Sequence, residues 1–147
     1  MIVLEIPTAP PSLNRWQRMH WLAQRRLSDA LKSHLSFALA SAGHPTSAVR
    51  VSSGEKAWIY LRLNPQAVGR RSVRIVRRYR TKRTELDHDN LVGGCKPLVD
   101  ALVRVGLIED DTPALVTVTY EQERGTGCRV EVRVAETAAA AECRMRA

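Results

Sequence analysis

The chain has 147 residues, which is the length of one domain with its own hydrophobic core rather than of two. It carries 23 Lys and Arg against 15 Asp and Glu, and this net charge of +8 favours a polyanionic partner without indicating a fold. Its three cysteines include no C-x-x-C pair, so neither a zinc ribbon nor a dithiol redox motif is supported. We expect reduced thiols in a cytoplasmic protein, with no signal peptide and no membrane partner.

The first half of the chain predicts a strand, a helix and a second strand. Ile2 to Ile6 reads as a short strand, and the prolines that follow it force an extended loop. Apolar residues spaced three and four apart from Ala23 to Ala42 predict an amphipathic helix, which Gly43 ends. Apolar and polar residues alternate from Glu55 to Leu63, a pattern typical of a half-buried strand.

The second half predicts three more strands, at residues 72–80, 116–120 and 130–134. The first of them is rich in arginine and follows a turn at residues 64–69. The other two alternate valine with polar residues, and the Gly-Thr-Gly sequence at residues 125–127 predicts a hairpin turn between them.

A second helix is predicted between these strands, because apolar residues from Leu91 to Val105 keep a helical phase. Pro97 interrupts that phase, since proline removes one backbone hydrogen bond. Either the helix begins near Lys96 with Pro97 in its first turn, or it runs from Asn90 with a kink.

The order of these elements is β-α-β-β-α-β-β, which implies a single α+β domain with two main helices against a mixed sheet. We place this domain at residues 1–134. Residues 135–147 are rich in alanine and predict a flexible C-terminal tail.

Three carboxylates near the second helix predict a metal site. Asp87 and Asp89 point to the same side if their segment is extended, and Asp111 lies just past the far end of the helix. A hard ion such as Mg²⁺ prefers carboxylate oxygens and water, and Mn²⁺ is a possible substitute. The alternative is that Asp89 or Asn90 caps the helix and that residues 109–111 form a solvated turn.

Lys96 and Asp100 lie four residues apart, a spacing typical of an ion pair on the surface of a helix. Lys96 also follows Asp89 by seven residues, which is two turns of a continuous helix. A lysine on that face would hold a phosphate or stabilise charge that builds on it. Glu85 would point to the same side as Asp87 and Asp89 in an extended segment. It is either a further metal ligand or a solvated residue at a strand end.

An ordered set of motifs in this chain resembles the RusA-type Holliday junction resolvases, Mg²⁺-dependent endonucleases of bacteria and phages. The matching stretches are Pro10-Pro11-Ser12-Leu13-Asn14-Arg15, Asp87-x-Asp89-Asn90-Leu91, Lys96, Asp100-Ala101-Leu102, Gly106-Leu107-Ile108 and Asp110-Asp111. With the segments between them they span most of the chain from Ile2 to Val134. One gap is longer than in the family's pattern, because Val92-Gly93-Gly94-Cys95 separates Leu91 from Lys96.

The resemblance implies a RusA-like endonuclease domain that resolves four-way DNA junctions in recombination and repair. It makes Asp87, Asp89 and Asp111 the metal-binding catalytic carboxylates, and Lys96 the catalytic lysine. It also implies a homodimer, with one active site per subunit cutting two opposed strands. The expected setting is the cytoplasm of a bacterium or of a phage-infected cell, and a prophage origin is possible.

Basic residues ahead of the acidic cluster predict phosphate contacts, which position DNA without reading its sequence. The predicted DNA-binding residues are Asn14, Arg15, Arg70, Arg71, Arg74, Arg77, Arg78, Arg80, Lys82 and Arg83. The basic run is either a protruding hairpin that contacts DNA or an edge strand blunted by charge. Trp16, Trp58 and Tyr60 are candidates for stacking on unpaired bases, although for the last two packing inside the protein is the alternative.

Other functions fit the acidic pair less well. A nucleotidyltransferase usually carries a Gly-Ser turn ahead of it, where this chain has Thr84-Glu85-Leu86. A metal-dependent glycosyltransferase needs a larger nucleotide-binding domain, and the chain has no Walker-type phosphate loop. The rival from another class is a non-catalytic basic DNA-binding protein that keeps the fold, for example a phage-derived one. Such a protein would hold DNA equally well in EDTA and would never nick it.

Overall fold

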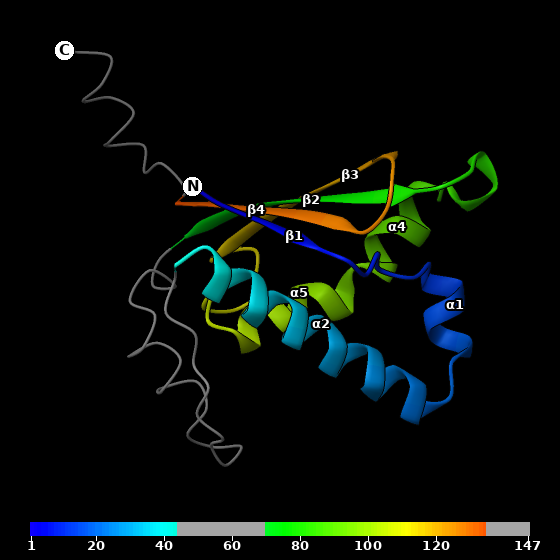
Figure 1. The fold of residues 1–147 in the computed structure, drawn as a ribbon, viewed down its shortest axis with the longest axis horizontal. Helices are drawn as coiled ribbons and strands as arrows, with labels where there is room; N and C mark the ends of the chain where they lie inside the picture. Colours follow the sequence, from blue (N-terminus) through cyan, green and yellow to red (C-terminus); the bar gives the residue numbers. More distant parts are fainter. Residues whose placement is uncertain (44–69, 135–147) are drawn as a thin grey trace.

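Helices and strands are mixed along the chain in the computed structural model, which describes residues 1–43 and 70–134 (Figure 1). The elements in order are β1 (Ile2–Ile6), α1 (Leu13–Arg18), α2 (Trp21–Ser41), β2 (Arg71–Tyr79), the short 3₁₀ helix η2 (Lys82–Thr84), α4 (His88–Gly94), α5 (Lys96–Arg104), β3 (Val116–Arg124) and β4 (Cys128–Val134). The predicted strand at residues 55–63, the turn at 64–69 and the tail at 135–147 lie outside the described residues. Within the described ranges, no helix is long and apolar enough to cross a membrane.

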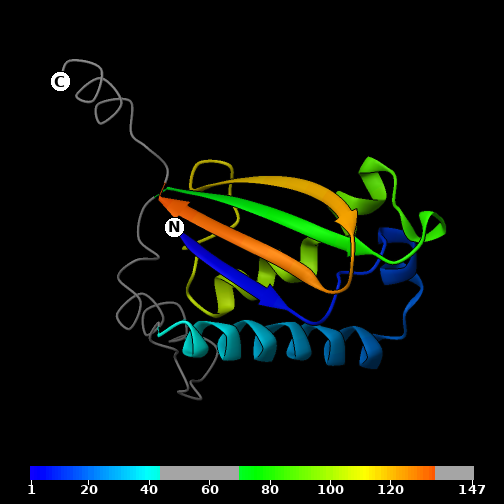
Figure 2. The same cartoon turned by 45° about the horizontal axis from the view of Figure 1, so that its top comes forward.

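The strands form one mixed sheet in the order β1-β4-β2-β3 (Figure 2). The pairs β1–β4 and β4–β2 are antiparallel, whereas β2 and β3 are parallel. This confirms the predicted α+β class with a mixed sheet. The arginine-rich strand β2 has a hydrogen-bonded neighbour on each side, so of the two alternatives for the basic run, the edge strand blunted by charge was wrong.

The predicted hairpin at residues 125–127 was also wrong, because β2 lies between β3 and β4. Residues 125–127 instead cross the end of β2, where the Gly125 amide donates to the Tyr79 carbonyl at 3.0 Å and the Arg78 amide donates to the Gly127 carbonyl at 3.1 Å. Gly127 has a φ of 77°, and a Cβ there would lie 2.3 Å from the Ile6 carbonyl oxygen. Alternating valines and turn glycines are common to both arrangements, so the sequence pattern does not distinguish them.

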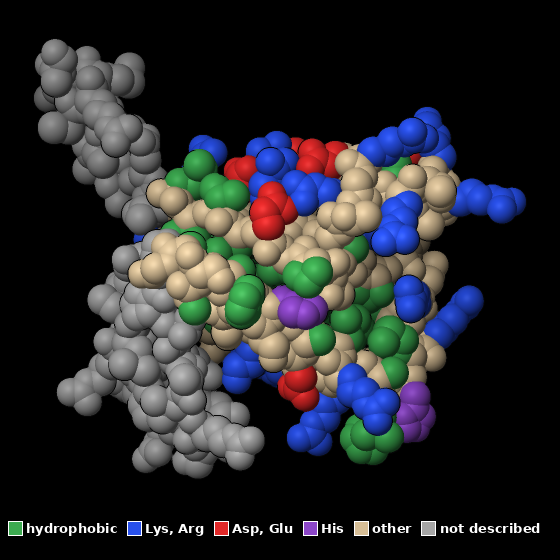
Figure 3. All heavy atoms as spheres, viewed as in Figure 1, with side chains coloured by type: hydrophobic (Ala, Val, Ile, Leu, Met, Phe, Trp, Pro, Cys, Tyr) green, Lys and Arg blue, Asp and Glu red, His purple; other side chains and the backbone are tan. Residues whose placement is uncertain are grey.

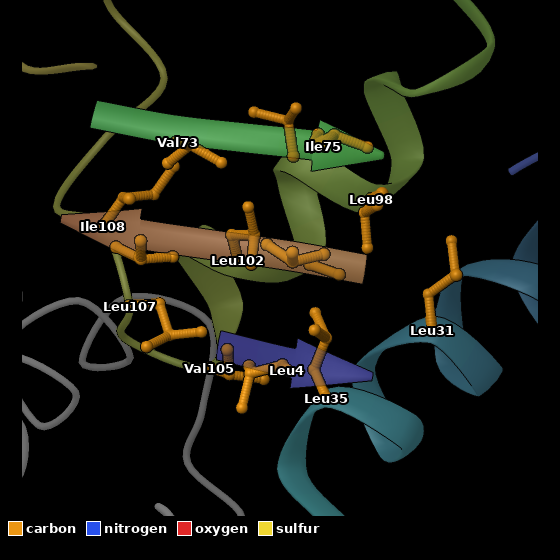
Figure 4. Close-up of a cluster of buried hydrophobic side chains, with 14 of the residues drawn as sticks. Leu4, Leu31, Leu35, Val73, Ile75, Leu98, Leu102, Val105, Leu107 and Ile108 are labelled. Atoms are coloured by element: carbon orange, nitrogen blue, oxygen red, sulfur yellow. The ribbon is translucent and has the colours of Figure 1, made fainter. Parts of the chain in front are cut away.

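The hydrophobic core lies between one face of the sheet and the helices α2 and α5 (Figure 4). Strand residues such as Leu4, Val73 and Ile75 face Leu35 of α2 and Leu102 of α5, and all five are almost fully buried. The core is aliphatic, as the low aromatic content of the chain requires. The core holds α5, whose first residue is Lys96, against the sheet.

The other face of the sheet carries a network of arginines and glutamates. Arg74 of β2 pairs with Glu121 at 2.6 Å and with Glu131 at 3.3 Å. Arg78 of β2 pairs with Glu5 at 2.5 Å and with Glu123 at 2.8 Å. Because these pairs join β2 to β1, β3 and β4, much of the charge of β2 is balanced within the sheet.

The predicted second helix is divided in two at Cys95. The helix α5 begins at Lys96 and has Pro97 in its first turn, where the missing amide costs no helical hydrogen bond. A separate short helix, α4, precedes it and spans residues 88–94. Cys95 and Cys128 are free and buried, and burial raises the pKa of the Cys95 thiol to about 12.

The two glycines at the end of α4 allow the N-terminal loop to pack directly on this helix. A Cβ at Gly94 would lie 1.9 Å from the Pro11 carbonyl oxygen, and a Cβ at Gly93 would lie 2.7 Å from the side chain of Leu13. The longer gap between Leu91 and Lys96 therefore has a structural role, because it places two residues without side chains against residues 11–13.

Candidate active site

Asp87 is the N-cap of α4, so the predicted cap at Asp89 or Asn90 was wrong by two or three residues. Its Oδ1 accepts from the Asn90 amide at 3.0 Å, and its Oδ2 accepts from Asn90 Nδ2 at 2.7 Å. These hydrogen bonds from Asn90 hold the pKa of Asp87 below its ordinary value. Asn90 Oδ1 in turn accepts from the backbone amide of Asn14 at 3.1 Å, which ties α4 to α1.

Asp89 lies in the first turn of α4 and is exposed. The structure does not have the extended segment on which the shared face of Asp87 and Asp89 depended, because the helix begins at His88. Residues two apart on a helix do not face one another. The Asp89 carboxylate makes no hydrogen bond or ion pair with any residue that the structure describes, so it is available to a ligand.

Lys96 brings two carboxylates together at the start of α5. Its Nζ contacts Asp111 Oδ2 directly and lies 2.9 Å from Asp100 Oδ1, as predicted for the latter pair. The hydrogen bond from Lys96 lowers the pKa of Asp111, and the two carboxylates raise the pKa of Lys96. Asp111 is thus part of an ion-pair cluster with a residue 15 positions away rather than of a purely solvated turn.

This cluster lies at the wall of an open groove of about 490 Å³, which we call the Lys96 groove. Its lining comes from α1, α4, α5 and β3, and includes Trp16, Val92, Lys96, Asp111 and Tyr120. Tyr120 was missed as a site residue. The alternation of Val116, Val118 and Tyr120 predicts that all three share one face of β3, but it does not indicate that this face borders the Lys96 groove. Burial raises the pKa of Tyr120.

The predicted metal ligands fit Mg²⁺ in their chemistry, since all three are carboxylates. They are not gathered as a set. Among residues 1–43 and 70–134, no three His, Cys, Asp or Glu side chains lie close enough to form a metal-binding group. Asp87 and Asp111 already accept hydrogen bonds from Asn90 and Lys96, and only Asp89 is without such a partner there.

The predicted DNA-binding residues divide into an engaged and an exposed group. Arg71 is buried, Arg74 and Arg78 pair with glutamates on the sheet, and Arg70 donates to Thr117 Oγ1 at 3.4 Å. Arg77 donates to the backbone carbonyls of Pro10 at 2.8 Å and Thr84 at 3.0 Å. Arg71, Arg74, Arg77 and Arg78 are thus buried or paired within the chain, whereas Arg70 is exposed and makes one long hydrogen bond.

The exposed group comprises Arg15, Arg80, Lys82 and Arg83. None of them forms an ion pair with a residue in the described part of the chain. They belong to α1 and to the segment around η2, at the end of the molecule where α4 begins, and Figure 3 shows Lys and Arg side chains gathered there. Asn14 contributes its backbone amide to the Asn90 contact. Arg80, Lys82 and Arg83 thus lie close to Asp87 and Asp89 in sequence, and Arg15 belongs to α1, which packs against α4.

Arg77→Ala tests whether this arginine is structural. We expect the free energy of unfolding to fall by about 2 kcal/mol, because two backbone carbonyls lose a charged donor. Arg80→Ala should change it by less than about 0.5 kcal/mol, since Arg80 is exposed and unpaired within the described residues. Urea denaturation followed by tryptophan fluorescence measures both variants. Equal stability of the two would contradict a structural role for Arg77.

Lys96→Met tests the ion-pair cluster. The pKa of Asp111 should rise toward its ordinary value of about 3.9, because its main hydrogen-bond donor is lost. In the native protein this pair stabilises the fold above the unfolded pKa of Asp111, and the contribution is lost as the pH falls through the lowered folded pKa. Carboxyl carbon NMR shifts during an acid titration report the pKa directly. Lys32→Met, which removes a lysine of α2, should leave Asp111 unchanged.

Comparison of the chain with protein-family models and with curated proteins finds no match. The resemblance to the RusA-type resolvases therefore rests on the order and spacing of the motifs in this sequence.

Proposed function

We propose that this chain is a RusA-type endonuclease that uses Mg²⁺ to cut four-way DNA junctions in recombination and repair. The observation that carries the proposal is the contact between Lys96 and Asp111 at the wall of an open groove. These residues are 15 positions apart in the chain and belong to the same ordered motif set. The fold brings their side chains into contact. The adjoining helix α4 carries Asp89, whose carboxylate has no partner among the residues that the structure describes.

Each group has a role in this proposal that follows from its chemistry. Asp87, Asp89 and Asp111 would hold the metal, which would supply a nucleophilic water and offset charge on the phosphate oxygens. Lys96 contributes a positive charge beside Asp111, where it stabilises charge on a bound phosphate. The exposed group Arg15, Arg80, Lys82 and Arg83 holds backbone phosphates, so affinity should fall steeply with salt.

Cleavage of a labelled synthetic four-way junction tests the proposal, with a linear duplex of the same sequence as the control. We expect paired nicks on the junction in Mg²⁺, none in EDTA, and little cutting of the duplex. Mn²⁺ should replace Mg²⁺, because it accepts the same oxygen ligands. Tight binding without cutting in either metal would rule out the nuclease.

A second candidate is a non-catalytic protein that binds branched DNA. It is favoured by the bonds that Asp87 and Asp111 already make, which leave only Asp89 unpartnered among the three carboxylates in the described residues. A binder of this kind would hold the junction equally well in Mg²⁺ and in EDTA. The cleavage assay therefore separates the two candidates in one measurement.

The proposal also includes a homodimer that acts in the cytoplasm of a bacterium or of a phage-infected cell. A four-way junction has two equivalent strands to cut, and a twofold dimer presents one site to each. Light scattering of the purified protein, alone and with junction DNA, measures whether two copies associate.

A further inference from the structure

A second groove, along α2, combines tryptophan rings with cationic side chains. It has a volume of about 570 Å³, and its lining includes Trp16, Trp21, Arg25, Asp29, Lys32 and Arg104. We call it the α2 groove. Trp16 also lines the Lys96 groove, so the two grooves adjoin at α1.

The lining residues of α2 form one stripe, because Trp21, Arg25, Asp29 and Lys32 follow one another at spacings of three or four. Arg104 comes from the last turn of α5, which packs beside α2 (Figure 1). Basic side chains are visible along this edge of the molecule in Figure 3. The groove is thus built by two helices that the hydrophobic core holds in place.

The charge in the α2 groove is predominantly positive. The charged residues that line it are three cations, Arg25, Lys32 and Arg104, and a single carboxylate, Asp29. None of these three cations forms an ion pair with another residue in the ranges that the structure describes, unlike the arginines on the outer face of the sheet. Unpaired cations along a groove attract a polyanion, and a chain of phosphates offers charges at regular intervals.

Trp21 offers a flat apolar surface beside these cations. Its side chain is 60% exposed, and its ring lies 5.7 Å from the His20 ring. Gln24 Nε2 donates to the Trp16 carbonyl at 2.8 Å, which fixes the end of α1 against the first turn of α2. An exposed tryptophan ring next to cations is suited to stacking on an unpaired base, whereas a duplex keeps its base faces covered.

We infer that the α2 groove binds an unpaired DNA strand, with phosphates on Arg25, Lys32 and Arg104 and a base stacked on Trp21. The inference deepens the proposed function and rests on it for the identity of the polymer. A strand that leaves a branch point at the Lys96 groove passes Trp16 and enters the α2 groove. Trp21 then binds the DNA strand but does not take part in its cleavage.

The first test measures the affinity for a labelled oligo-dT of about 12 nucleotides by fluorescence anisotropy in EDTA. We expect Trp21→Ala to weaken binding about tenfold and Trp21→Phe to keep most of the affinity, because an aromatic face remains. Phe37→Ala is the matched control. Phe37 is an aromatic residue of the same helix, 75% exposed and outside the groove lining, so its removal should leave the affinity unchanged.

The second test measures the salt dependence of the same binding. Replacing both Arg25 and Lys32 by glutamine should reduce the slope of log K against log salt by about 1.4, since two phosphate contacts are lost. Duplex DNA should bind with an affinity that does not depend on Trp21. Far-UV circular dichroism of each variant checks that the fold is kept.

Equal affinity of Trp21→Ala and wild type for oligo-dT would overturn the inference. Equal affinity for poly-glutamate and oligo-dT would do so as well, because it would show a site for any polyanion. The assay needs no metal and no cutting, so its result does not depend on whether the protein is a nuclease. A protein that never cuts but binds through Trp21 contradicts the nuclease alone, and one that cuts without using Trp21 contradicts the α2 groove alone.

Discussion

Asp89→Asn is expected to lower the rate of junction cleavage by at least about a hundredfold while leaving junction binding intact. Loss of a residue that only supports a metal ligand typically costs ten- to a hundredfold, so loss of a ligand itself should cost more. The fold should be kept, because Asp89 is exposed and its carboxylate makes no hydrogen bond or ion pair with another described residue. Its removal forfeits only a favourable charge at the start of α4, worth a few tenths of a kcal/mol.

Single-turnover cleavage in Mg²⁺ measures this effect, and gel-shift binding in EDTA measures the affinity. Glu85→Gln is the matched control, since it removes the same charge from an exposed residue four positions earlier in the chain. Asp87→Asn is less informative, because both oxygens of Asp87 accept hydrogen bonds from Asn90, so the substitution changes the helix cap as well as the charge. If Asp89→Asn and Glu85→Gln lower the rate equally, then the effect is not specific to Asp89.

Gly94→Ala should have the largest effect on stability. The new Cβ would lie 1.9 Å from the Pro11 carbonyl oxygen and 3.0 Å from the Ser12 carbonyl carbon, and neither backbone atom can turn aside. The helix α4 must therefore move away from residues 11–13, which also threatens the Asn14–Asn90 hydrogen bond. We expect the free energy of unfolding to fall by about 3 kcal/mol, even though alanine favours a helix over glycine by about 1 kcal/mol.

Gly93→Ala provides the control for that prediction. Its Cβ would meet only the side chain of Leu13, at 2.7 Å, and that side chain can change rotamer. The gain in helix propensity offsets part of the cost, so we expect a net change within about 1 kcal/mol. Urea denaturation of the two variants in parallel gives the difference, and equal losses would contradict the close approach at Gly94.

Much of the fold was predictable from local patterns in the sequence. The strand at Ile2–Ile6, the amphipathic helix ending near Gly43 and the strand beginning near residue 72 all appear in the structure within a few residues. Each depends on alternation or helical spacing, which the sequence records directly. The Lys96–Asp100 pair was predictable for the same reason, because both residues lie on one helix.

The pairing of distant segments was not predictable in the same way. Which strand lies next to β4 depends on where β2 inserts, and no local pattern of β3 or β4 contains that information. The division of the basic run into engaged and exposed residues has the same origin. Arg77 reads like its neighbours in sequence, but its partners Pro10 and Thr84 lie 67 and 7 positions away.

The crossing at residues 125–127 has a consequence for the order of folding. A hairpin forms early because its strands meet across a short turn, but here β3 and β4 each pair with β2 and not with one another. In the sheet Arg74 of β2 lies opposite Thr119 of β3 and Glu131 of β4. Both strand pairings therefore join residues that are far apart in the chain. Such non-local topology slows folding toward the millisecond-to-second range. On the ribosome, β2 emerges well before its two neighbours and must wait for both before the sheet is complete.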